Sequence, residues 1–290
     1  MHSHNKFSKL IIFEMANNHM GNVSHAEKII KTYKNIAQKY NYNFAFKLQY
    51  RDLNSFIHKA FKNRSDFHYV KRFNETKLSE NQFNKIINTI KKNKFKAIAT
   101  PFDEKSVDLI VKQNLDFIKV ASCSFDDWPL LEKISLTNKP IILSTAGAEI
   151  NTIDKVVSFL KNRKKLFCLM HCVAEYPTPF NKLNLGRISL LKKRYLDIPI
   201  GYSSHELPEN FENIKIAISN GAEIFEKHVG LATKKYLLNK YSISPNQTKD
   251  WLSSLDKTYK SLKISPKKNK KEEASLRSLR RGVYLNKNIK

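Results

Sequence analysis

Short apolar runs alternate with amphipathic stretches along almost the whole chain, and this alternation is the feature that most restricts its fold. The first apolar run, residues 9–14 (KLIIFE), is followed by residues 24–40, whose apolar positions recur at helical spacing. An amphipathic stretch likewise follows each of the apolar runs at residues 44–49, 95–102, 116–122, 140–147, 166–172, 198–204 and 222–229. Eight strand–helix pairs in 290 residues predict an α/β fold, a (β/α)8 TIM barrel, which needs ~250 residues.

Two further features concern the local structure of this barrel. Ser24 and Glu27 form an S-x-x-E pattern that predicts a capping box for the first helix, and Ser79 is expected to cap the helix that follows the second strand and its long connection. Residues 50–77 form a long aromatic and basic connection, and a loop of that length is often functional. We interpret its aromatic residues as a local core or a dimer contact, and less readily as a substrate lid. These residues are Phe56, Phe61, Phe67, Tyr69 and Phe73.

Composition excludes several classes of protein. No apolar run approaches the ~20 residues of a membrane-spanning helix, and the first residues lack a secretory signal, so we expect a cytoplasmic protein without membrane partners. Cys123, Cys168 and Cys172 have no CxxC spacing and predict neither a disulfide framework nor a zinc site. The net charge of +26 is consistent with nucleic-acid binding, but its lysines are spread over nearly every predicted helix. We therefore predict solvated helix faces and no specific nucleic acid.

Polar side chains stand at the end of every predicted strand. A TIM barrel places these ends on one face, where its active site is built. In chain order they are Glu14, Lys47 with Gln49, Thr100, Lys119 with Ser122, Ser144 with Thr145, His171, His205, and Glu226 with His228. Because burying charge is costly unless it is paired or bound to a ligand, this set predicts a functional site.

The residue types indicate a metal site beside an anion site. His205 and His228 follow adjacent strands and could coordinate a divalent metal, which leaves positions for water and substrate. Lys47 and Lys119 suit the phosphate and carboxylate of a small anion. Glu14 could act as a general base or orient a water.

Eight motifs together resemble the sialic acid synthase family, the N-acetylneuraminate synthases and their relatives for legionaminic and pseudaminic acids. They are EMANNHMGN, FKLQ, ATPFD, IKVAS, LSTAG, HCVAEYPTP, IGYSSHE and IFEKHVG, in that order between about residues 10 and 263. The resemblance implies an enzyme that condenses phosphoenolpyruvate with a 2-acetamido aldose, such as N-acetylmannosamine. The product would be a nine-carbon 2-keto-3-deoxy acid, formed with release of phosphate. A divalent metal (Mn²⁺, or Mg²⁺ or Co²⁺) and a homodimer are also implied.

The same resemblance implies a role for each site residue. His205 and His228 would be the metal ligands, and Glu14 would position or deprotonate a water or hydroxyl near the metal. Phosphoenolpyruvate would be bound by Lys47, Gln49, Thr100, Lys119, Ser122 and Ser144. Tyr176 would line the sugar site, and Glu226 and Asn239 would complete the substrate-binding set. His171 and His19 are interpreted as supporting residues behind the site.

The chain departs from the family pattern at three places. Ser124 stands where a glutamate is usual, and Asn239 stands where an aspartate is common, so negative charge is lost beside the sugar. We expect a catalytic barrel over residues 1–265, followed by a short basic linker over residues 266–290. The resemblance implies that such a linker leads to an antifreeze-like domain, which we expect to be absent or truncated here.

Two alternative functions remain open at this point. The first is another phosphoenolpyruvate–aldose enzyme that makes a shorter 3-deoxy-ulosonate, because it would share the lysines and the metal. The second is a catalytically impaired synthase-like barrel that acts as a binding protein, because both departures beside the sugar remove charge.

Overall fold

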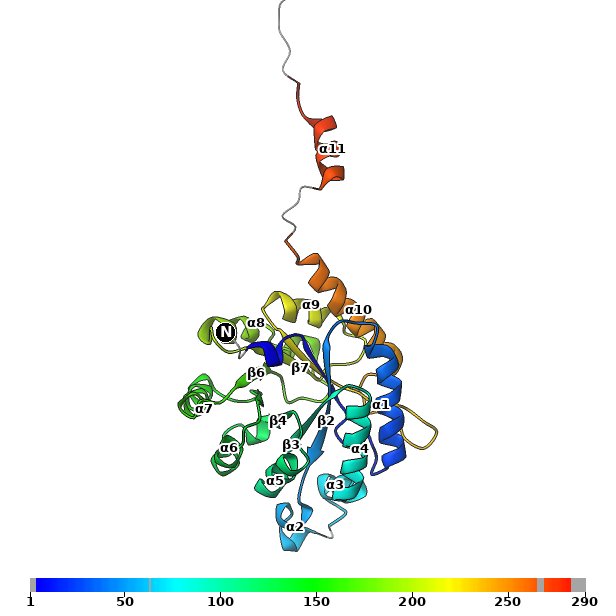
Figure 1. Cartoon of the computed structure of the whole chain (residues 1–290), viewed down its shortest axis with the longest axis vertical. Coiled ribbons are helices and arrows are strands. Elements are labelled where there is room, and N and C mark those ends of the chain that lie inside the picture. Colours follow the sequence, from blue (N-terminus) through cyan, green and yellow to red (C-terminus); the bar gives the residue numbers. More distant parts are fainter. Residues whose placement is uncertain (1–3, 63, 265–268, 283–290) are drawn as a thin grey trace, which may run out of the picture.

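The protein is a closed eight-stranded parallel barrel, as the alternation predicts (Figure 1). The computed structural model describes residues 4–62, 64–264 and 269–282. Each strand pairs in parallel with the next along the chain, and β8 pairs with β1 to close the barrel. The strands are β1 (Leu10–Glu14), β2 (Asn43–Tyr50), β3 (Lys96–Pro101), β4 (Phe117–Val120), β5 (Ile141–Ser144), β6 (Phe167–His171), β7 (Ile200–Ser204) and β8 (Ile224–His228).

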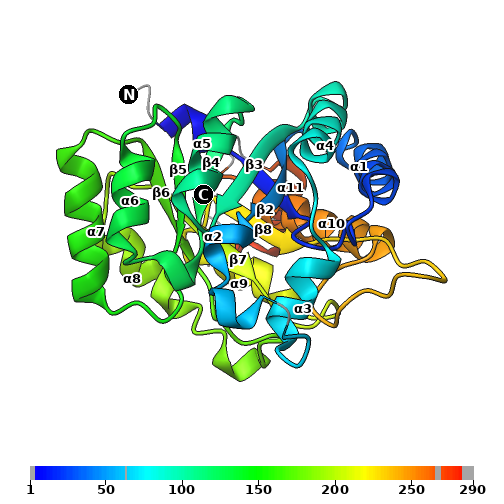
Figure 2. The ribbon, with the colours of Figure 1, turned by 90° about the horizontal axis from the view of Figure 1, so that it is seen from below.

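Eight α-helices surround the strands, one after each strand or its loop (Figures 1 and 2). They are α1 (Val23–Ala37), α4 (Glu80–Lys92), α5 (Glu104–Lys112), α6 (Trp128–Ser135), α7 (Ile150–Asn162), α8 (Gly186–Arg194), α9 (Glu212–Ser219) and α10 (Pro245–Ser261). Each helix turns buried apolar residues toward the outer wall of the barrel, as Ile29, Ile30 and Tyr33 of α1 do. Short 3₁₀ turns occur at η1 (His4–Phe7), η3 (Ser122–Ser124) and η4 (Phe180–Lys182).

The predicted cap of α1 is wrong, and that of α4 is confirmed. Helix α1 begins at Val23, and its N-cap is Asn22, whose side-chain oxygen accepts a hydrogen bond from the backbone N–H of His25. Asn22 reaches this donor from an extended backbone, so the helix has already begun before Ser24. Ser79 caps α4 and forms a capping box with Gln82.

The barrel interior has an apolar floor beneath a polar layer. Alternate residues of the strands point inward, and together with Phe7 of η1 they form one buried apolar cluster. Its strand residues are Leu10, Ile12, Ala45, Ile98, Phe117, Ile142, Cys168, Met170 and Ile224. Two residues beyond, on the same inward faces, six strands place Glu14, Lys47, Thr100, Lys119, Ser144 and Glu226. Because side chains alternate between the inside and the outside along each of these strands, the last inward side chain lies at the mouth of the barrel.

Gly201 of β7 is required by the narrowness of this interior. A Cβ atom there would lie 2.3 Å from the sulfur of Met170 and 2.7 Å from the carbonyl oxygen of Ile224. Only glycine therefore allows β7 to lie this close to its neighbours, and β7 carries the chain directly to His205.

The long connection after β2 contains three short helical segments, namely α2 (Leu53–Phe56), η2 (Lys59–Phe61) and α3 (His68–Glu75). Figure 2 shows this insertion at one end of the barrel and η1 at the other. Its aromatic rings contact one another, with centroids 6.1 Å apart for Phe56 and Phe73 and 5.2 Å apart for Phe61 and Phe67. Phe56 and Phe61 are still about 40% exposed, and none of the three segments has a buried residue, so the rings contact one another without forming the expected buried core.

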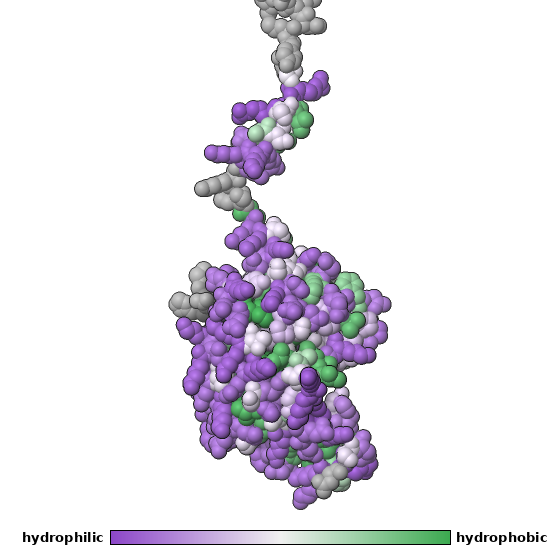
Figure 3. Space-filling model, turned by 90° about the vertical axis from the view of Figure 1, so that its right-hand side faces the viewer, coloured by the Kyte–Doolittle hydropathy of each residue, from purple (hydrophilic) through white to green (hydrophobic). Residues whose placement is uncertain are grey.

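Beyond α10, the region expected to be a linker contains helix α11 (Lys270–Leu279), which has no buried residue and is drawn apart from the barrel in Figure 1. Residues 266–268 and 283–290 of the expected linker lie outside the described residues. Within the described part of the chain, no helix has both the length and the apolar character needed to cross a membrane. The face shown in Figure 3 is mainly hydrophilic, with small scattered apolar areas.

Candidate active site

Four charged side chains from four strands meet in the polar layer of the barrel. The ammonium of Lys47 contacts a carboxylate oxygen of Glu14 and lies 2.9 Å from Glu226. The ammonium of Lys119 lies 3.1 and 3.0 Å from the two carboxylate oxygens of Glu226, and the hydroxyl of Ser203 donates to Glu226 at 2.8 Å. All four charged residues are exposed by 5% or less. Two cations and two anions thus form a neutral buried network, which we call the charged layer.

The charged layer changes the proton affinity of its members. Burial alone would raise the pKa of Glu226, but Lys119 and Lys47 outweigh it and hold that pKa well below its usual range. Burial lowers the pKa of Lys47 to about 7, against the attraction of Glu226. An ammonium has three N–H donors, and the ion pairs described above use two on Lys47. Each lysine therefore keeps a donor for an anion at the barrel mouth.

The two histidines lie side by side beyond the charged layer. The ring centroids of His205 and His228 are 5.4 Å apart. Nδ1 of His205 is 2.9 Å from the carbonyl oxygen of Val173, and because a carbonyl only accepts, Nδ1 carries the hydrogen and Nε2 the lone pair. Nδ1 of His228 is buried without a hydrogen-bond partner. Burial lowers the pKa of both rings, to about 4 for His205, so both are neutral near pH 7.

This pair fits a metal with two protein ligands. Both rings are neutral, each has a nitrogen lone pair, and their centroids are 5.4 Å apart. Among the described residues no group of three or more His, Cys, Asp or Glu side chains is arranged to hold a metal. Any ion here would therefore take its remaining ligands from water or substrate.

Two tyrosines flank the histidines. The ring of Tyr176 lies 4.4 Å from that of His205 and 5.2 Å from that of Tyr241, while Tyr241 lies edge-on to His228 at 5.0 Å. The sequence predicted Tyr176 but not Tyr241, because Tyr241 lies in the loop after β8 with no recognisable motif. Together they form an aromatic wall beside the imidazoles.

The neutral predicted residues line the same end of the barrel. Thr100 and Ser144 are buried on β3 and β5, at inward positions two residues beyond the apolar floor. The hydroxyl of Ser122 accepts a hydrogen bond from the backbone N–H of Ala146 at 3.2 Å, which ties the β4 end to the β5 loop. The side chain of Gln49 accepts from Arg51 at 3.1 Å.

Arg51 is a further residue that the sequence did not single out. Its guanidinium stacks on Phe102 and Phe73, 3.6 and 4.2 Å from the ring centroids. Through Gln49 and these rings it connects the β2 end to the insertion.

The remaining predicted residues lie around the site. The side-chain amide of Asn239 donates to Asn18 at 3.5 Å, and its oxygen accepts from the backbone N–H of Tyr241 at 3.3 Å, so it orders the loop that carries Tyr241. Ser124 is buried in the turn after β4. The ring of His171 stacks at 6.0 Å on Tyr202.

The two histidines interpreted as supporting residues both make local contacts. Nε2 of His171 donates to the carbonyl oxygen of Leu183 at 2.9 Å, and its strand neighbours Leu169 and Tyr202 belong to the outer core. His171 is therefore outside the charged layer. Nδ1 of His19 accepts from the backbone N–H of Gly21 at 3.0 Å, which stabilises the loop after β1.

A second buried ion pair lies on the outer side of the barrel wall. Lys227 stands between Glu226 and His228 but faces the opposite way, and its ammonium is 2.6 Å from the carboxylate of Glu206. The hydroxyl of Tyr202 also donates to Glu206, at 3.3 Å. Glu206 directly follows His205, so this pair connects the chain segments that carry the two histidines.

Replacing Lys227 by methionine should lower the free energy of unfolding by about 3 kcal/mol, because Glu206 would remain buried without its cation. Replacing both Lys227 by methionine and Glu206 by leucine should recover most of the loss. Urea unfolding of the variants measures both effects. The control is Lys215→Met, which breaks the exposed pair with Glu212 and should cost about 0–1 kcal/mol. Equal losses in the Lys227 and Lys215 variants would contradict this role.

Comparison with known proteins agrees with the resemblance of the motifs. The model of the NeuB family matches residues 36–267. A solved structure, of a putative spore coat polysaccharide biosynthesis protein E from Chromobacterium violaceum, is 51% identical with a TM-score of 0.91 and covers 94% of this chain and 82% of its own. The N,N'-diacetyllegionaminic acid synthase of Campylobacter jejuni is 29% identical over 293 residues, 97% of this chain and 86% of the relative.

A third relative is the N-acetylneuraminate-9-phosphate synthase of Drosophila melanogaster, 30% identical over 251 residues, which are 83% of this chain. The chain spans 66% of that enzyme's length and 62% of the length of an uncharacterized Methanocaldococcus jannaschii relative. The matched region includes every strand of the barrel except β1. The chain belongs to the NeuB family.

Proposed function

We propose that the chain condenses phosphoenolpyruvate with a 2-acetamido aldose, N-acetylmannosamine or a related sugar, to give a nine-carbon 2-keto-3-deoxy sugar acid and phosphate. The observation that carries this proposal is the charged layer beside the histidine pair: the barrel holds two buried ammoniums, each with a donor to spare, and two neutral imidazoles, with Lys47 close enough to His228 to lower its pKa. The names of the relatives from Campylobacter and Drosophila support the same class of product.

The anionic substrate would be held by the lysines. The phosphate and carboxylate of phosphoenolpyruvate would take the remaining donors of Lys47 and Lys119, which Glu226 holds together. Gln49, Thr100, Ser122 and Ser144 would add neutral hydrogen bonds around the anion. Because the site is buried, these charge-assisted hydrogen bonds would be stronger than in water.

The proposed reaction forms a carbon–carbon bond and a C2–O bond to water, and it breaks the C2–O bond to phosphate. C3 of phosphoenolpyruvate attacks the aldehyde carbon of the open-chain sugar, and the aldehyde oxygen takes up a proton. Water then adds to C2 and gives up a proton, and phosphate leaves with cleavage of the C2–O bond, which generates the keto group. Glu14 would take a proton, and its Oε1, buried without a hydrogen-bond partner, supports this role. Tyr176 and Tyr241 would cover the sugar side and exclude bulk water.

A divalent metal is part of the proposal, with Mn²⁺ as the first candidate and Mg²⁺ or Co²⁺ as others. The neutral rings of His205 and His228 would hold it, in agreement with the unpartnered nitrogen on His228. Such an ion polarises a bound aldehyde oxygen as a Lewis acid. We also propose a homodimer, to be checked by light scattering.

The direct test is phosphate release from phosphoenolpyruvate, with and without Mn²⁺, across a panel of sugars. The panel includes N-acetylmannosamine, its 6-phosphate, 6-deoxy 2-acetamido hexoses and a phosphorylated aldopentose. Release that requires both metal and a 2-acetamido sugar is the expected result. Release only with the phosphorylated aldopentose would replace this function with synthesis of a shorter ulosonate. A folded, metal-loaded chain that releases no phosphate with any sugar would overturn catalysis.

The KM for phosphoenolpyruvate should rise as the pH increases above about 7. The free Lys47 loses its proton near that pH, and only the protonated form attracts the anion. The groups that influence it are Glu14, Glu226, Lys119 and Cys172. A bound anion raises the pKa of Lys47. The affinity for phosphoenolpyruvate is therefore full at pH values below the pKa of Lys47 in the free enzyme, and above that pKa it falls by up to about tenfold per pH unit.

The measurement is kcat/KM for phosphoenolpyruvate from pH 6 to 9. The control is Lys47→Arg, because a guanidinium does not titrate in this range and its profile should be flatter. A KM that is equally independent of pH in both proteins would exclude Lys47 as the titrating group.

A further inference from the structure

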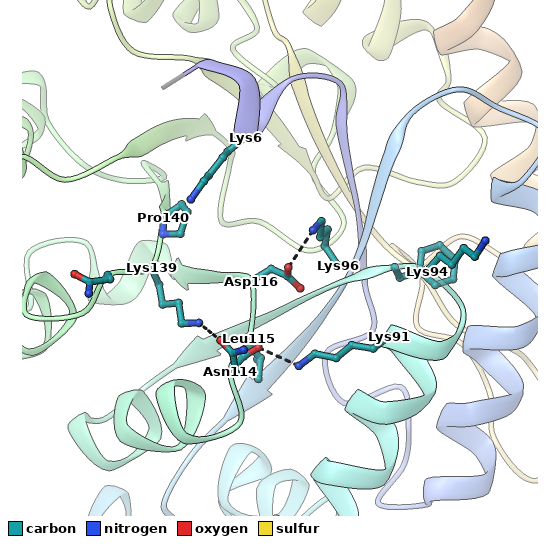
Figure 4. Close-up of a pocket in the computed structure, with 11 residues that line it drawn as sticks. Lys6, Lys91, Lys94, Lys96, Asn114, Leu115, Asp116, Lys139 and Pro140 are labelled. Atoms are coloured by element: carbon teal, nitrogen blue, oxygen red, sulfur yellow. Dashed lines mark hydrogen bonds and ion pairs between the residues drawn. The ribbon is translucent and has the colours of Figure 1, made fainter. Parts of the chain in front are cut away.

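A lysine-rich groove lies at the end of the barrel opposite the candidate active site (Figure 4). Its volume is about 520 Å³. Its walls come from η1, the C-terminal end of α4, the start of β3 and the loops before β4 and β5. The residues that define this groove are Lys6, Lys91, Lys94, Phe95, Lys96, Asn114, Leu115, Asp116, Asn138, Lys139 and Pro140.

The groove carries more positive charge than its own carboxylate balances. Five lysines line it, and Asp116 is the one acidic residue among its lining residues. Asp116 is already engaged, because one oxygen accepts from the backbone N–H of Ala97 at 2.8 Å and the other lies 3.2 Å from Lys96. Its charge therefore offsets at most one of the five ammoniums.

Two of the lysines point into the groove toward neutral oxygens only. Lys91 donates to the backbone oxygen of Asn114 at 3.0 Å, and Lys139 donates to the side-chain oxygen of the same residue at 2.5 Å (Figure 4). Burial lowers the pKa of Lys139, and the neighbouring charges of Lys91 and Lys6 lower it further, against the attraction of Asp116. The lysines repel one another here, and this repulsion would be relieved by an anion.

Catalysis does not explain this concentration of charge. The active site of a TIM barrel lies at the C-terminal ends of its strands, whereas this groove opens at their N-terminal ends. The lysines come from segments far apart in the sequence, residues 6, 91–96 and 139, so they are not one charged face of a single helix. The fold brings them together around one space.

We propose that this groove binds a compact polyphosphate, a ligand with several consecutive phosphate groups. Lysine ammoniums bind phosphate oxygens as point charges, and ammoniums spread around a groove of this size suit a phosphate chain better than a single phosphate. Phe95, the one aromatic residue of the lining, is only 5% exposed and offers no stacking surface to a nucleobase. Recognition is therefore of the phosphate chain, whether it is inorganic or part of a nucleoside triphosphate.

Calorimetric titration of the full chain with inorganic tripolyphosphate, in about 0.15 M salt to screen diffuse charge, tests this site. The groove variant is Lys91→Gln with Lys139→Gln. The control is Lys28→Gln with Lys31→Gln, which removes the same charge from another surface depression, on α1. The expected result is saturable binding that weakens at least tenfold in the groove variant and is unchanged in the control.

Further ligands identify the recognised group. Orthophosphate should bind at least tenfold more weakly than tripolyphosphate. ATP should bind no more tightly than tripolyphosphate. The proposal would be overturned if tripolyphosphate showed no saturable binding at this salt concentration, or if the groove variant and the control variant lost affinity equally. Either result would mean that the groove only contributes to the overall positive charge of the protein. Much tighter binding of ATP than of tripolyphosphate would overturn recognition of the phosphate chain alone. The assay needs no sugar, phosphoenolpyruvate or metal, so its outcome is independent of the proposed catalysis.

Discussion

Replacing His205 by alanine is expected to abolish metal-dependent phosphate release and to weaken Mn²⁺ binding by more than about 100-fold. Loss of a residue that merely orients a metal ligand costs 10–100-fold in affinity, so loss of one of two ligands should cost more. The fold should survive, because the His205 ring contacts Tyr176 and His228 near the barrel mouth, away from the apolar floor. Electron paramagnetic resonance of Mn²⁺ measures binding separately from turnover.

The matched control for this variant is His68→Ala. His68 is an exposed histidine of α3, and its loss should leave Mn²⁺ affinity and activity unchanged. A His205→Ala protein that is folded and binds Mn²⁺ as tightly as the unaltered chain would remove His205 from the proposed metal site. Loss of turnover with unchanged metal binding would assign it a different role.

Replacing Glu226 by alanine should lower the free energy of unfolding by about 5 kcal/mol. Removal of one partner from a buried ion pair typically costs 3–5 kcal/mol, and Glu226 is the partner of two buried lysines. Glu14 would still pair with Lys47, whereas Lys119 would lose its carboxylate partner on β8. Chemical denaturation at pH 7 measures the loss.

The pH dependence of this loss has a definite sign. Without Glu226 the folded state favours uncharged lysines, so the unfolded state binds more protons, and stability rises with pH toward the unfolded lysine pKa of about 10.4. The loss should therefore be smaller at pH 9 than at pH 7. The double variant Glu226→Leu with Lys119→Met should be more stable than Glu226→Ala, because an apolar pair leaves fewer buried charges unmatched. A loss below 1 kcal/mol in Glu226→Ala would show that the lysines are not held by this carboxylate.

Much of the fold and of the site was predictable from local patterns. Because side chains alternate along a strand, an apolar residue pointing inward, such as Ile12 or Ile224, is followed two residues later by an inward Glu14 or Glu226. The sequence placed these residues at strand ends, and a parallel barrel brings all strand ends to one face. The cap of α1 was missed because Asn22 and Ser24 are both good N-cap residues, and the backbone before the helix decides between them.

Contacts between distant segments could not be predicted in the same way. Tyr241 reaches His228 only because its loop folds back over the barrel, and Lys227 meets Glu206 only because β7 and β8 are neighbours. The lysine-rich groove likewise joins residues from four separate segments. Each depends on loop paths and on side-chain directions that local periodicity does not specify.

The sequence by itself determined the eight strand–helix units, the resemblance to the family and the residue types at the barrel mouth, because hydrophobic periodicity and motif spacing are local properties of the chain. Only the tertiary structure decided which charges neutralise one another. Closure of the barrel turns Glu226 inward to Lys47 and Lys119 and its neighbour Lys227 outward to Glu206. The physical reason is that an ion pair depends on distances of a few ångströms across strands, and these distances exist only once the barrel has closed.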